Sequence, residues 1–324
     1  MGGAGNAAVS KASIDRAVYG MKRVIDNVER IIVGKRYAIE LIMATLACRG
    51  HILIEDVPGV GKTSLASALA RSVNGTFTRV QFTPDIMPSD ITGFSAYNPK
   101  TGDFEFRPGA VMSQFVLADE INRTSPKTQS SLLEVMEENQ VTVDGQTYAV
   151  PVPFIVLATQ NPVEYLGTYP LPEAQLDRFF MKISMGYPDA ADEGRMLERF
   201  KAGDPLRALE PVTSGEEITY IQDVAERIYI NAEMNSYIVN IVRQTRTHDA
   251  VVLGASPRAS LCLYKASQAW ALYCGRDFVI PDDIMQMAPH VLEHRIMLKQ
   301  EAKLRHVSPV DVIRSVLNKS RTEV

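Results

Sequence analysis

The chain has 324 residues, of which 46% are hydrophobic and 22% are charged, as is usual for a globular protein of about two domains of ~150 residues each. Its net charge of −4 argues against a nucleic-acid-binding protein, and no apolar run approaches the ~18 residues that a membrane-spanning helix needs. The three widely spaced cysteines (Cys48, Cys262 and Cys274) form no disulfide or zinc pattern, and residues 1–11 contain no signal-peptide core. We therefore expect a protein of the reducing cytoplasm.

The first half of the sequence alternates between helical and strand patterns. Apolar residues at helical spacing from Ile14 to Ile32 predict an amphipathic helix, and a second helical stretch follows Gly34 and ends near Arg49. The predicted strands are 51–55, 78–82, 114–120, 154–160 and 181–185. The predicted helices between them are 62–73, 125–139 with Ser125 as N-cap, and a short one around 173–179. This alternation predicts an α/β fold with a parallel sheet and helices on both faces.

Two hairpins and a change of pattern complete this organisation. One hairpin is predicted over 93–106 and the other over 140–150, where Asp144–Gly145 is a strong turn signal. After Pro188 the strand pattern stops, and residues 189–324 read as almost wholly helical. We therefore expect an α/β domain with two hairpin insertions over 1–187 and a smaller helical domain over 188–324.

A phosphate-binding loop is predicted between the strand 51–55 and the helix 62–73. The end of the pattern G-x-x-x-x-G-K-[ST] is matched by Gly61, Lys62 and Thr63. Gly59 and Gly61 permit the close approach of backbone N–H groups to phosphates at a helix N-terminus. Lys62 supplies a positive charge to the outer phosphates, and Thr63 supplies a hydroxyl to Mg²⁺.

Asp56 replaces the first glycine of this pattern. A carboxylate aimed at a phosphate ~6 Å away would cost about 3 kcal/mol at an effective dielectric of ~20. We therefore expect the side chain to point away from the phosphates. Because aspartate tolerates left-handed dihedrals and can bond its own loop backbone, we interpret Asp56 as a turn-forming substitute for glycine.

Polar residues follow two of the other predicted strands. Asp119 and Glu120 end the apolar strand 114–120, and Asn161 follows the strand 154–160. Ligands of open α/β sheets bind at the carboxyl ends of the strands. Asp119 is therefore a candidate for the Mg²⁺ site, Glu120 for activating a water molecule, and Asn161 for positioning it. Taken singly, Asp119 and Glu120 also suit a helix cap, and Asn161 suits a turn before Pro162.

Five motifs together resemble the MoxR family of AAA+ ATPases. They are PGVGKT (58–63), LADEINR (117–123), TQNP (159–162), PEAQLDRF (172–179) and GASPRAS (254–260). The resemblance covers nearly the whole chain, and it implies an AAA+ core with hairpin insertions followed by a helical lid. It also implies that the departure at Asp56 is tolerated.

The resemblance further implies roles for two arginines. Arg178 is similar to an arginine finger that acts on the site of a neighbouring subunit, and Arg258 to an arginine that contacts the γ-phosphate of its own subunit. The alternatives are an ion pair of Arg178 with Asp177 and a helix-start role for Arg258. Arg123 is a second candidate for reaching across a subunit boundary.

The adenine is expected to contact the segment from Ile32 to Gly34, whose alternative role is ordinary core packing before a helix break. The full expected nucleotide site is Val33, Gly34, Pro58, Gly59, Val60, Gly61, Lys62, Thr63, Ser64 and Asp119. The resemblance implies ATP and Mg²⁺ as cofactors, and a homo-oligomeric, hexameric ring. It also implies a partner with a von Willebrand factor A domain and a client protein that the ATPase remodels.

Three other functions remain open from the sequence. The pattern His290-x-x-Glu293-His294 matches an inverted zinc-protease signature, although the pattern is short and an amphipathic helix explains it better. A nucleotide-gated scaffold with little turnover is disfavoured by the presence of Glu120, Asn161 and Arg178. A DNA-handling motor is disfavoured by the acidic balance and by the lack of a basic stripe with interleaved aromatic residues.

Overall fold

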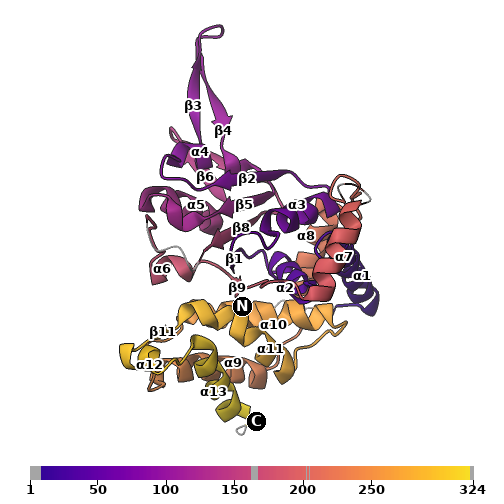
Figure 1. Cartoon of the computed structure of the whole chain (residues 1–324), viewed down its shortest axis with the longest axis vertical. Helices are drawn as coiled ribbons and strands as arrows, with labels where there is room; N and C mark the ends of the chain where they lie inside the picture. The colour runs from indigo at the N-terminus through magenta and orange to yellow at the C-terminus, as the bar shows by residue number, and fades with distance from the viewer. Residues whose placement is uncertain (1–8, 162–166, 202, 204, 322–324) are drawn as a thin grey trace, which may run out of the picture.

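A five-stranded parallel sheet forms the centre of the α/β part of the chain, with the strand order β2-β5-β8-β1-β9 (Figure 1). The computed structural model describes residues 9–161, 167–201, 203 and 205–321. Residues 1–8 of the N-terminal segment 1–11, and Pro162 of the TQNP motif, therefore lie outside the described residues. The strands are β1 (Ile52–Glu55), β2 (Phe77–Gln81), β5 (Phe115–Asp119), β8 (Ile155–Gln160) and β9 (Met181–Ile183). Glu55 lies opposite Gln160, and Gln81 opposite Asp119, so these carboxyl ends share one edge.

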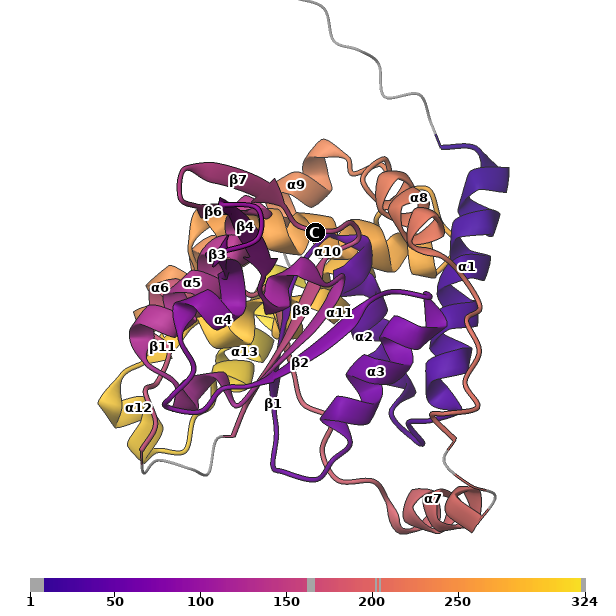
Figure 2. The same ribbon diagram turned by 90° about the horizontal axis from the view of Figure 1, so that it is seen from above.

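Helices cover both faces of this sheet, as the sequence predicts. One face is covered by α1 (Lys11–Glu29), α2 (Arg36–Ala47) and α3 (Lys62–Ser72), and the other by α5 (Pro126–Glu138) (Figure 2). Side chains of one strand alternate between the two faces. Ile52 and Ile54 therefore join the buried cluster of α1–α3, whereas Leu53 between them packs with the residues of α5. This double burial explains why the strands have continuous apolar sequences.

Both predicted hairpins form, but they differ in exposure. They consist of β3 (Gly93–Asn98) with β4 (Asp103–Pro108), and β6 (Gln140–Val143) with β7 (Gln146–Ala149). The β3–β4 hairpin projects from the body of the protein after the short helix α4 (Pro88–Thr92), which the sequence pattern did not predict (Figure 1). Its Phe94, Tyr97 and Phe104 are exposed, whereas Phe106 stacks on Tyr148 of β7 with 4.0 Å between ring centroids.

The C-terminal part is mostly helical. Its elements are α7 (Ala190–Lys201), α8 (Gly215–Ala225), α9 (Ala232–Thr247), α10 (Pro257–Tyr273), α11 (Pro281–Leu292), α12 (Gln300–Leu304) and α13 (Pro309–Arg321). The expectation of an almost wholly helical region missed a small antiparallel pair, β10 (Val251–Leu253) with β11 (Met297–Leu298). Strands of two or three residues are too short to show a period of two. No helix in the described ranges is long and apolar enough to cross a membrane.

The helix α8 links the two parts of the chain. It packs against α1 and α2, and Glu217 in its first turn accepts hydrogen bonds from Arg16 of α1. Ser214 is its N-cap and accepts from the N–H of Glu217. The boundary at 187/188 remains a prediction, since α8 lies after it in sequence and packs on helices that precede it.

His51 occupies a buried position where α5 meets the sheet. The N–H of Val156 donates to its Nδ1 at 3.0 Å, so its Nε2 carries the proton that is donated to the carbonyl of Met136, also at 3.0 Å. Burial lowers the pKa of this imidazole from 6.5 to about 4. The folded protein therefore holds His51 neutral over a range in which the unfolded chain is protonated.

This burial predicts a loss of stability in mild acid. Between pH ~6.5 and ~4 the unfolded chain binds a proton that the folded chain does not, so the free energy of unfolding falls as the pH falls. The contribution of His51 approaches about 3 kcal/mol. Urea unfolding at several pH values should show this slope, and it should be shallower in His51→Asn, whose amide oxygen can still accept from Val156. Parallel pH profiles for the two proteins would contradict the assignment.

Candidate nucleotide site

The loop between β1 and α3 has the geometry of an anion-binding loop. Gly59 and Gly61 have φ of 86° and 88°, a region that favours glycine, and Gly61 is the N-cap of α3. The side chain of Lys62, at the first position of this helix, donates to the carbonyls of Asp56 (2.9 Å) and Val57 (3.3 Å). A cation and the N-terminus of an 11-residue helix therefore meet at this loop.

The rest of the predicted loop follows the same path. Pro58 and Gly59 are exposed at its tip, and Val60, Thr63 and Ser64 are partly buried as the chain enters α3. Ile32 of the predicted adenine segment lies beside it, since a Cβ built on Gly61 would be 3.7 Å from the Cδ1 of Ile32. The structure therefore brings the phosphate-loop residues and this segment together.

Asp56 points away from the loop, as expected from its charge. Its buried carboxylate accepts hydrogen bonds from the Ser184 hydroxyl (2.9 Å), the Gly186 N–H (3.1 Å) and the Met185 N–H. The explanation as a glycine substitute is wrong, because Asp56 is not among the described residues with a positive φ and its side-chain partners follow β9. Asp56 joins the carboxyl end of β1 to the segment that follows β9.

Asp56→Gly, which restores the general loop pattern, should therefore destabilise the protein. It leaves the N–H groups of Met185 and Gly186 without their acceptor, at about 1–3 kcal/mol each, and adds chain entropy to the unfolded state. We expect the free energy of unfolding to fall by about 2–5 kcal/mol in denaturant titrations. Asp56→Asn keeps one carbonyl oxygen and should lose less. Equal stability of Asp56→Gly and the parent would contradict this role.

The Asp119 carboxylate is buried at the end of β5 and is held by two side chains. Thr159 of β8 donates to its Oδ1 at 2.6 Å, and Arg79 of β2 donates to its Oδ2 at 2.7 Å. Neither partner was singled out from the sequence. Arg79 and Gln81 alternate with apolar residues in 78–82, so they lie on one face of the strand. This pattern of two polar side chains on one face could have identified them as site residues.

Glu120 has an uncommon backbone conformation, with φ 56° and ψ 50°. Its N–H donates to Thr159 (2.8 Å), and its carboxylate accepts from Gln81 (2.8 Å) and Arg123 (2.9 Å). Arg123, at the end of the short helix η2 (Ile121–Arg123), therefore contacts Glu120 of its own chain. Backbone strain of this kind is concentrated at functional sites.

Asn161 and Gly34 complete this edge of the sheet. Asn161 is buried directly after β8, next to the ends of β1 and β5. Gly34 has φ 71°, and a Cβ there would be 1.7 Å from a carboxylate oxygen of Asp192 in α7. A glycine is thus required at position 34 by its dihedral angle and by the close approach of α7. The segment that includes Val33 and Gly34 therefore lies next to that helix.

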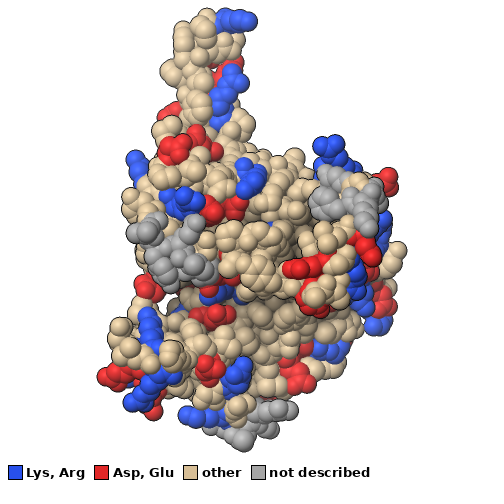
Figure 3. All heavy atoms as spheres, in the orientation of Figure 1, with Lys and Arg blue, Asp and Glu red and all other residues tan. Residues whose placement is uncertain are grey.

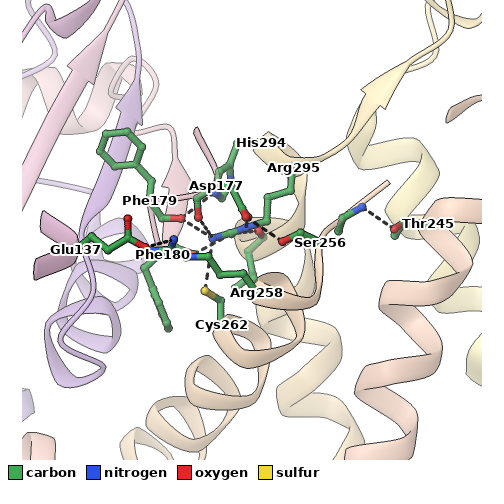
Figure 4. Close-up of polar contacts among 12 residues, drawn as sticks. Glu137, Asp177, Phe179, Phe180, Thr245, Ser256, Arg258, Cys262, His294 and Arg295 are labelled. Carbon is green, nitrogen blue, oxygen red and sulfur yellow. Dashed lines mark hydrogen bonds and ion pairs between the residues drawn. The ribbon is translucent and has the colours of Figure 1, made fainter. Parts of the chain in front are cut away.

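Arg178 and Arg258 lie at the opposite edge of the sheet, and both pair with Glu137. The Glu137 carboxylate accepts from Nε of Arg178 at 3.2 Å and from Nη1 of Arg258 at 2.8 Å (Figure 4 labels Glu137 and Arg258). Glu137 is in the last turn of α5, which returns from the end of β5 to the start of β8. At ~3.3 Å per residue, the four residues of β1 alone separate this edge from the phosphate loop by ~13 Å.

In this arrangement Arg258 pairs with Glu137 and lies away from the phosphate loop of its own chain, so its contact with the γ-phosphate stays a prediction. The predicted site residues divide into two groups. Lys62, Thr63, Asp119, Glu120 and Asn161 lie at the carboxyl edge, and Arg178 and Arg258 lie together at the amino edge, a grouping that no sequence spacing indicated.

Comparisons with known proteins agree with this geometry. A model of the ATPase family associated with various cellular activities (AAA) matches residues 51–181, and a model of the AAA lid domain matches 243–316. YeaC of Bacillus subtilis is 51% identical, with 93% of this chain and 94% of YeaC covered. Chaperone MoxR1 of Mycobacterium tuberculosis is 42% identical, with 93% of this chain and 81% of that protein covered.

This chain belongs to the MoxR family of AAA+ ATPases. A crystal structure of a protein from Cytophaga hutchinsonii has the same fold, with a TM-score of 0.88 and 39% identity over 95% of this chain and 97% of that one. The predicted AAA+ core with a helical lid is therefore confirmed, as is the prediction of an ATPase.

The zinc-protease alternative finds no support in this MoxR-family structure. Within the described ranges, no group of three His, Cys, Asp or Glu side chains is placed to hold a metal ion. His290 contacts the Tyr37 hydroxyl at 2.8 Å, Glu293 pairs with Lys182, and His294 bonds the Phe179 carbonyl at 3.1 Å. Burial lowers the pKa of both histidines, as expected for neutral packed imidazoles.

Proposed function

We propose that this MoxR-family ATPase hydrolyses ATP with Mg²⁺ at sites between the subunits of a ring. The observation that carries the proposal is the separation of the phosphate loop from Arg178 and Arg258 at opposite edges of the sheet. One chain presents its loop and its two arginines in different directions. A second copy, placed with its amino edge against the carboxyl edge of the first, supplies the missing positive charge.

The residues at the carboxyl edge fit ATP and Mg²⁺. The N-terminus of α3 and Lys62 suit the phosphates, and the Thr63 hydroxyl and Asp119 carboxylate are the oxygen ligands that Mg²⁺ prefers. When bound, Mg²⁺ neutralises charge on the phosphate oxygens. Arg79 and Thr159 each hold one oxygen of Asp119, so these two side chains would orient the carboxylate for the metal.

Glu120 is the proposed base, and Asn161 positions the attacking water. Gln81 and Arg123 engage one oxygen of Glu120, so the carboxylate is held by its own chain. Accepting a proton from water requires this carboxylate to turn from Gln81 towards the phosphate loop. The contact with Gln81 therefore suits a resting state.

Arg178 and Arg258 are proposed to act together on the neighbouring subunit's nucleotide. In the isolated chain Glu137 pairs with both guanidinium groups, and its single negative charge offsets only part of their two positive charges. The triphosphate of a neighbour carries more negative charge than one carboxylate and competes for both arginines. This replaces the expected cis role of Arg258 with a trans role.

We propose that hydrolysis remodels a partner protein in a hexameric assembly. The relative named a chaperone supports a client protein, and a protein with a von Willebrand factor A domain stays a proposed partner. The alternatives receive no added support. Basic and acidic side chains are mixed on the face drawn in Figure 3, which does not resemble a DNA-binding surface.

The proposal is tested by measuring phosphate release against protein and Mg²⁺ concentration, with sedimentation to follow assembly. We expect turnover per subunit to rise as the protein assembles, to require Mg²⁺, and to be abolished in Lys62→Ala. A preparation shown to be monomeric that hydrolyses ATP as fast as the assembled protein would overturn the shared site. Turnover no higher than that of Lys62→Ala under all conditions would favour the scaffold.

A further inference from the structure

A buried arginine from the lid holds the segment that carries Arg178. Arg295 ends the short helix η3 (Glu293–Arg295), and its side chain is 1% exposed. Its Nε donates to the Asp177 carboxylate at 2.7 Å, and its Nη2 donates to the carbonyls of Asp177 (3.0 Å) and Phe179 (2.6 Å). Its Nη1 donates to the Phe180 carbonyl at 3.2 Å and to the Val291 carbonyl (Figure 4).

These contacts involve the backbone of the residues directly before and after Arg178. The chain from 177 to 180 lies between the four-residue helix α6 (Glu173–Leu176) and β9, so few of its carbonyls have partners in a helix or strand. Arg295 supplies N–H donors to the carbonyls of Asp177 and Phe179, the two neighbours of Arg178. The planar guanidinium fixes their relative position, because its donors have a rigid geometry.

The same segment is tied to the start of α10. The Ser256 hydroxyl donates to the other oxygen of Asp177 at 2.8 Å, and Ser256 precedes Arg258 by two positions (Figure 4). His294, next to Arg295, adds a bond to the Phe179 carbonyl at 3.1 Å. Asp177 therefore joins two lid segments, one of which carries Arg258, to the segment that carries Arg178.

Stability alone accounts poorly for this arrangement. A buried ion pair of arginine and aspartate contributes little compared with apolar packing of similar volume. Here the guanidinium also gives hydrogen bonds to four backbone carbonyls, three of them on the segment 177–180. The contacts specify the path of that short segment.

We propose that Arg295 is a positioning residue. It holds Arg178, together with Arg258, at the angle that the neighbouring subunit's nucleotide requires. This inference rests on the proposed hydrolysis between subunits. Because Arg295 and Ser256 both belong to the lid, a rotation of the lid moves Arg178 and Arg258 as one unit. The position of the lid in one subunit therefore controls hydrolysis in the next.

Arg295→Lys tests this role, since lysine keeps the charge and loses the fork of donors. A misplacement of ~1 Å can cost ~10²-fold in rate, so we expect kcat to fall about 10- to 100-fold, with KM and the affinity for a fluorescent ATP analogue unchanged. The matched control is Arg276→Lys. Arg276 pairs with buried Asp283 in the lid, away from Arg178, so its variant should keep kcat.

Mixing experiments separate positioning from a general structural defect. Arg295→Lys mixed with Lys62→Ala should regain activity, because the latter still presents intact arginines. Arg295→Lys mixed with Arg178→Ala should not, because neither protein presents a correctly placed Arg178. If Arg295→Lys restores activity to Arg178→Ala, or keeps normal kcat alone, the positioning role is wrong.

A milder variant covers the case in which Arg295→Lys does not fold. Ser256→Ala removes one hydrogen bond to Asp177 and should lower kcat several-fold without changing KM. Unchanged kcat in Ser256→Ala would then overturn the proposal. If Lys62→Ala and Arg178→Ala do not complement each other, the proposed hydrolysis between subunits is wrong, and the role of Arg295 is rejected with it.

Discussion

Arg178→Ala is expected to lower kcat for ATP hydrolysis by about 10³- to 10⁵-fold, the effect typical of an arginine that neutralises charge in phosphoryl transfer. The affinity of the unassembled protein for ATP should change little, because Arg178 lies at the sheet edge opposite the loop of its own chain. Steady-state kinetics and binding of a fluorescent nucleotide check the two halves of this result. An ion pair with a purely local role would change the rate only slightly, since such a pair contributes under ~1 kcal/mol.

A complementation assay provides the control. Lys62→Ala and Arg178→Ala should each be inactive, whereas an assembled mixture should recover part of the activity, because some sites then combine an intact loop with an intact neighbouring arginine. Both variants must first be shown to fold and assemble. Persistent inactivity of the assembled mixture would rule out the trans role of Arg178.

Glu120→Gln is expected to lower kcat by about 10²- to 10⁴-fold, the usual contribution of a general base, while ATP binding is retained. The amide preserves the shape of the side chain but cannot accept a proton. Glu134→Gln, at an exposed position of α5, is the matched control and should keep normal kcat. A Glu120→Gln protein that turns over normally would remove Glu120 from the role of base.

This variant also offers a route to the partner. A ring that binds ATP and does not hydrolyse it should retain a client or a protein with a von Willebrand factor A domain. Proteins enriched on Glu120→Gln over both the parent and Lys62→Ala would be candidates for the remodelled partner. Equal recovery on all three proteins would give no support to nucleotide-dependent capture.

Local sequence signals were sufficient for most of the fold. The sheet follows from apolar strands and helix caps such as Ser125, whose hydroxyl accepts from Thr128 as expected. Asp144 and Gly145 both adopt positive φ in their hairpin turn. These features depend on neighbours within a few residues, which is the range over which sequence patterns are informative.

The features that the sequence did not predict depend on distant partners. Asp56 bonds Ser184–Gly186 far along the chain, and Gln81 meets Glu120 only because β2 and β5 are adjacent. The position of Arg258 depends on how the lid packs against α5, which no spacing encodes. Side-chain roles at the site therefore required the tertiary structure, although the residues at the carboxyl edge were identified from motifs.

The contacts of Asp56 link two segments of the candidate nucleotide site. Its carboxylate accepts a hydrogen bond from the N–H of Gly186, and α7 begins a few residues later in the chain. Asp192 of α7 lies close to Gly34. If a bound triphosphate moves the start of the phosphate loop, the contact between Asp56 and Gly186 should transmit this movement to α7. The fluorescence of a label on the outer side of α7 should thus change when ATP binds, although the label does not contact ATP. The change should be smaller in Asp56→Asn.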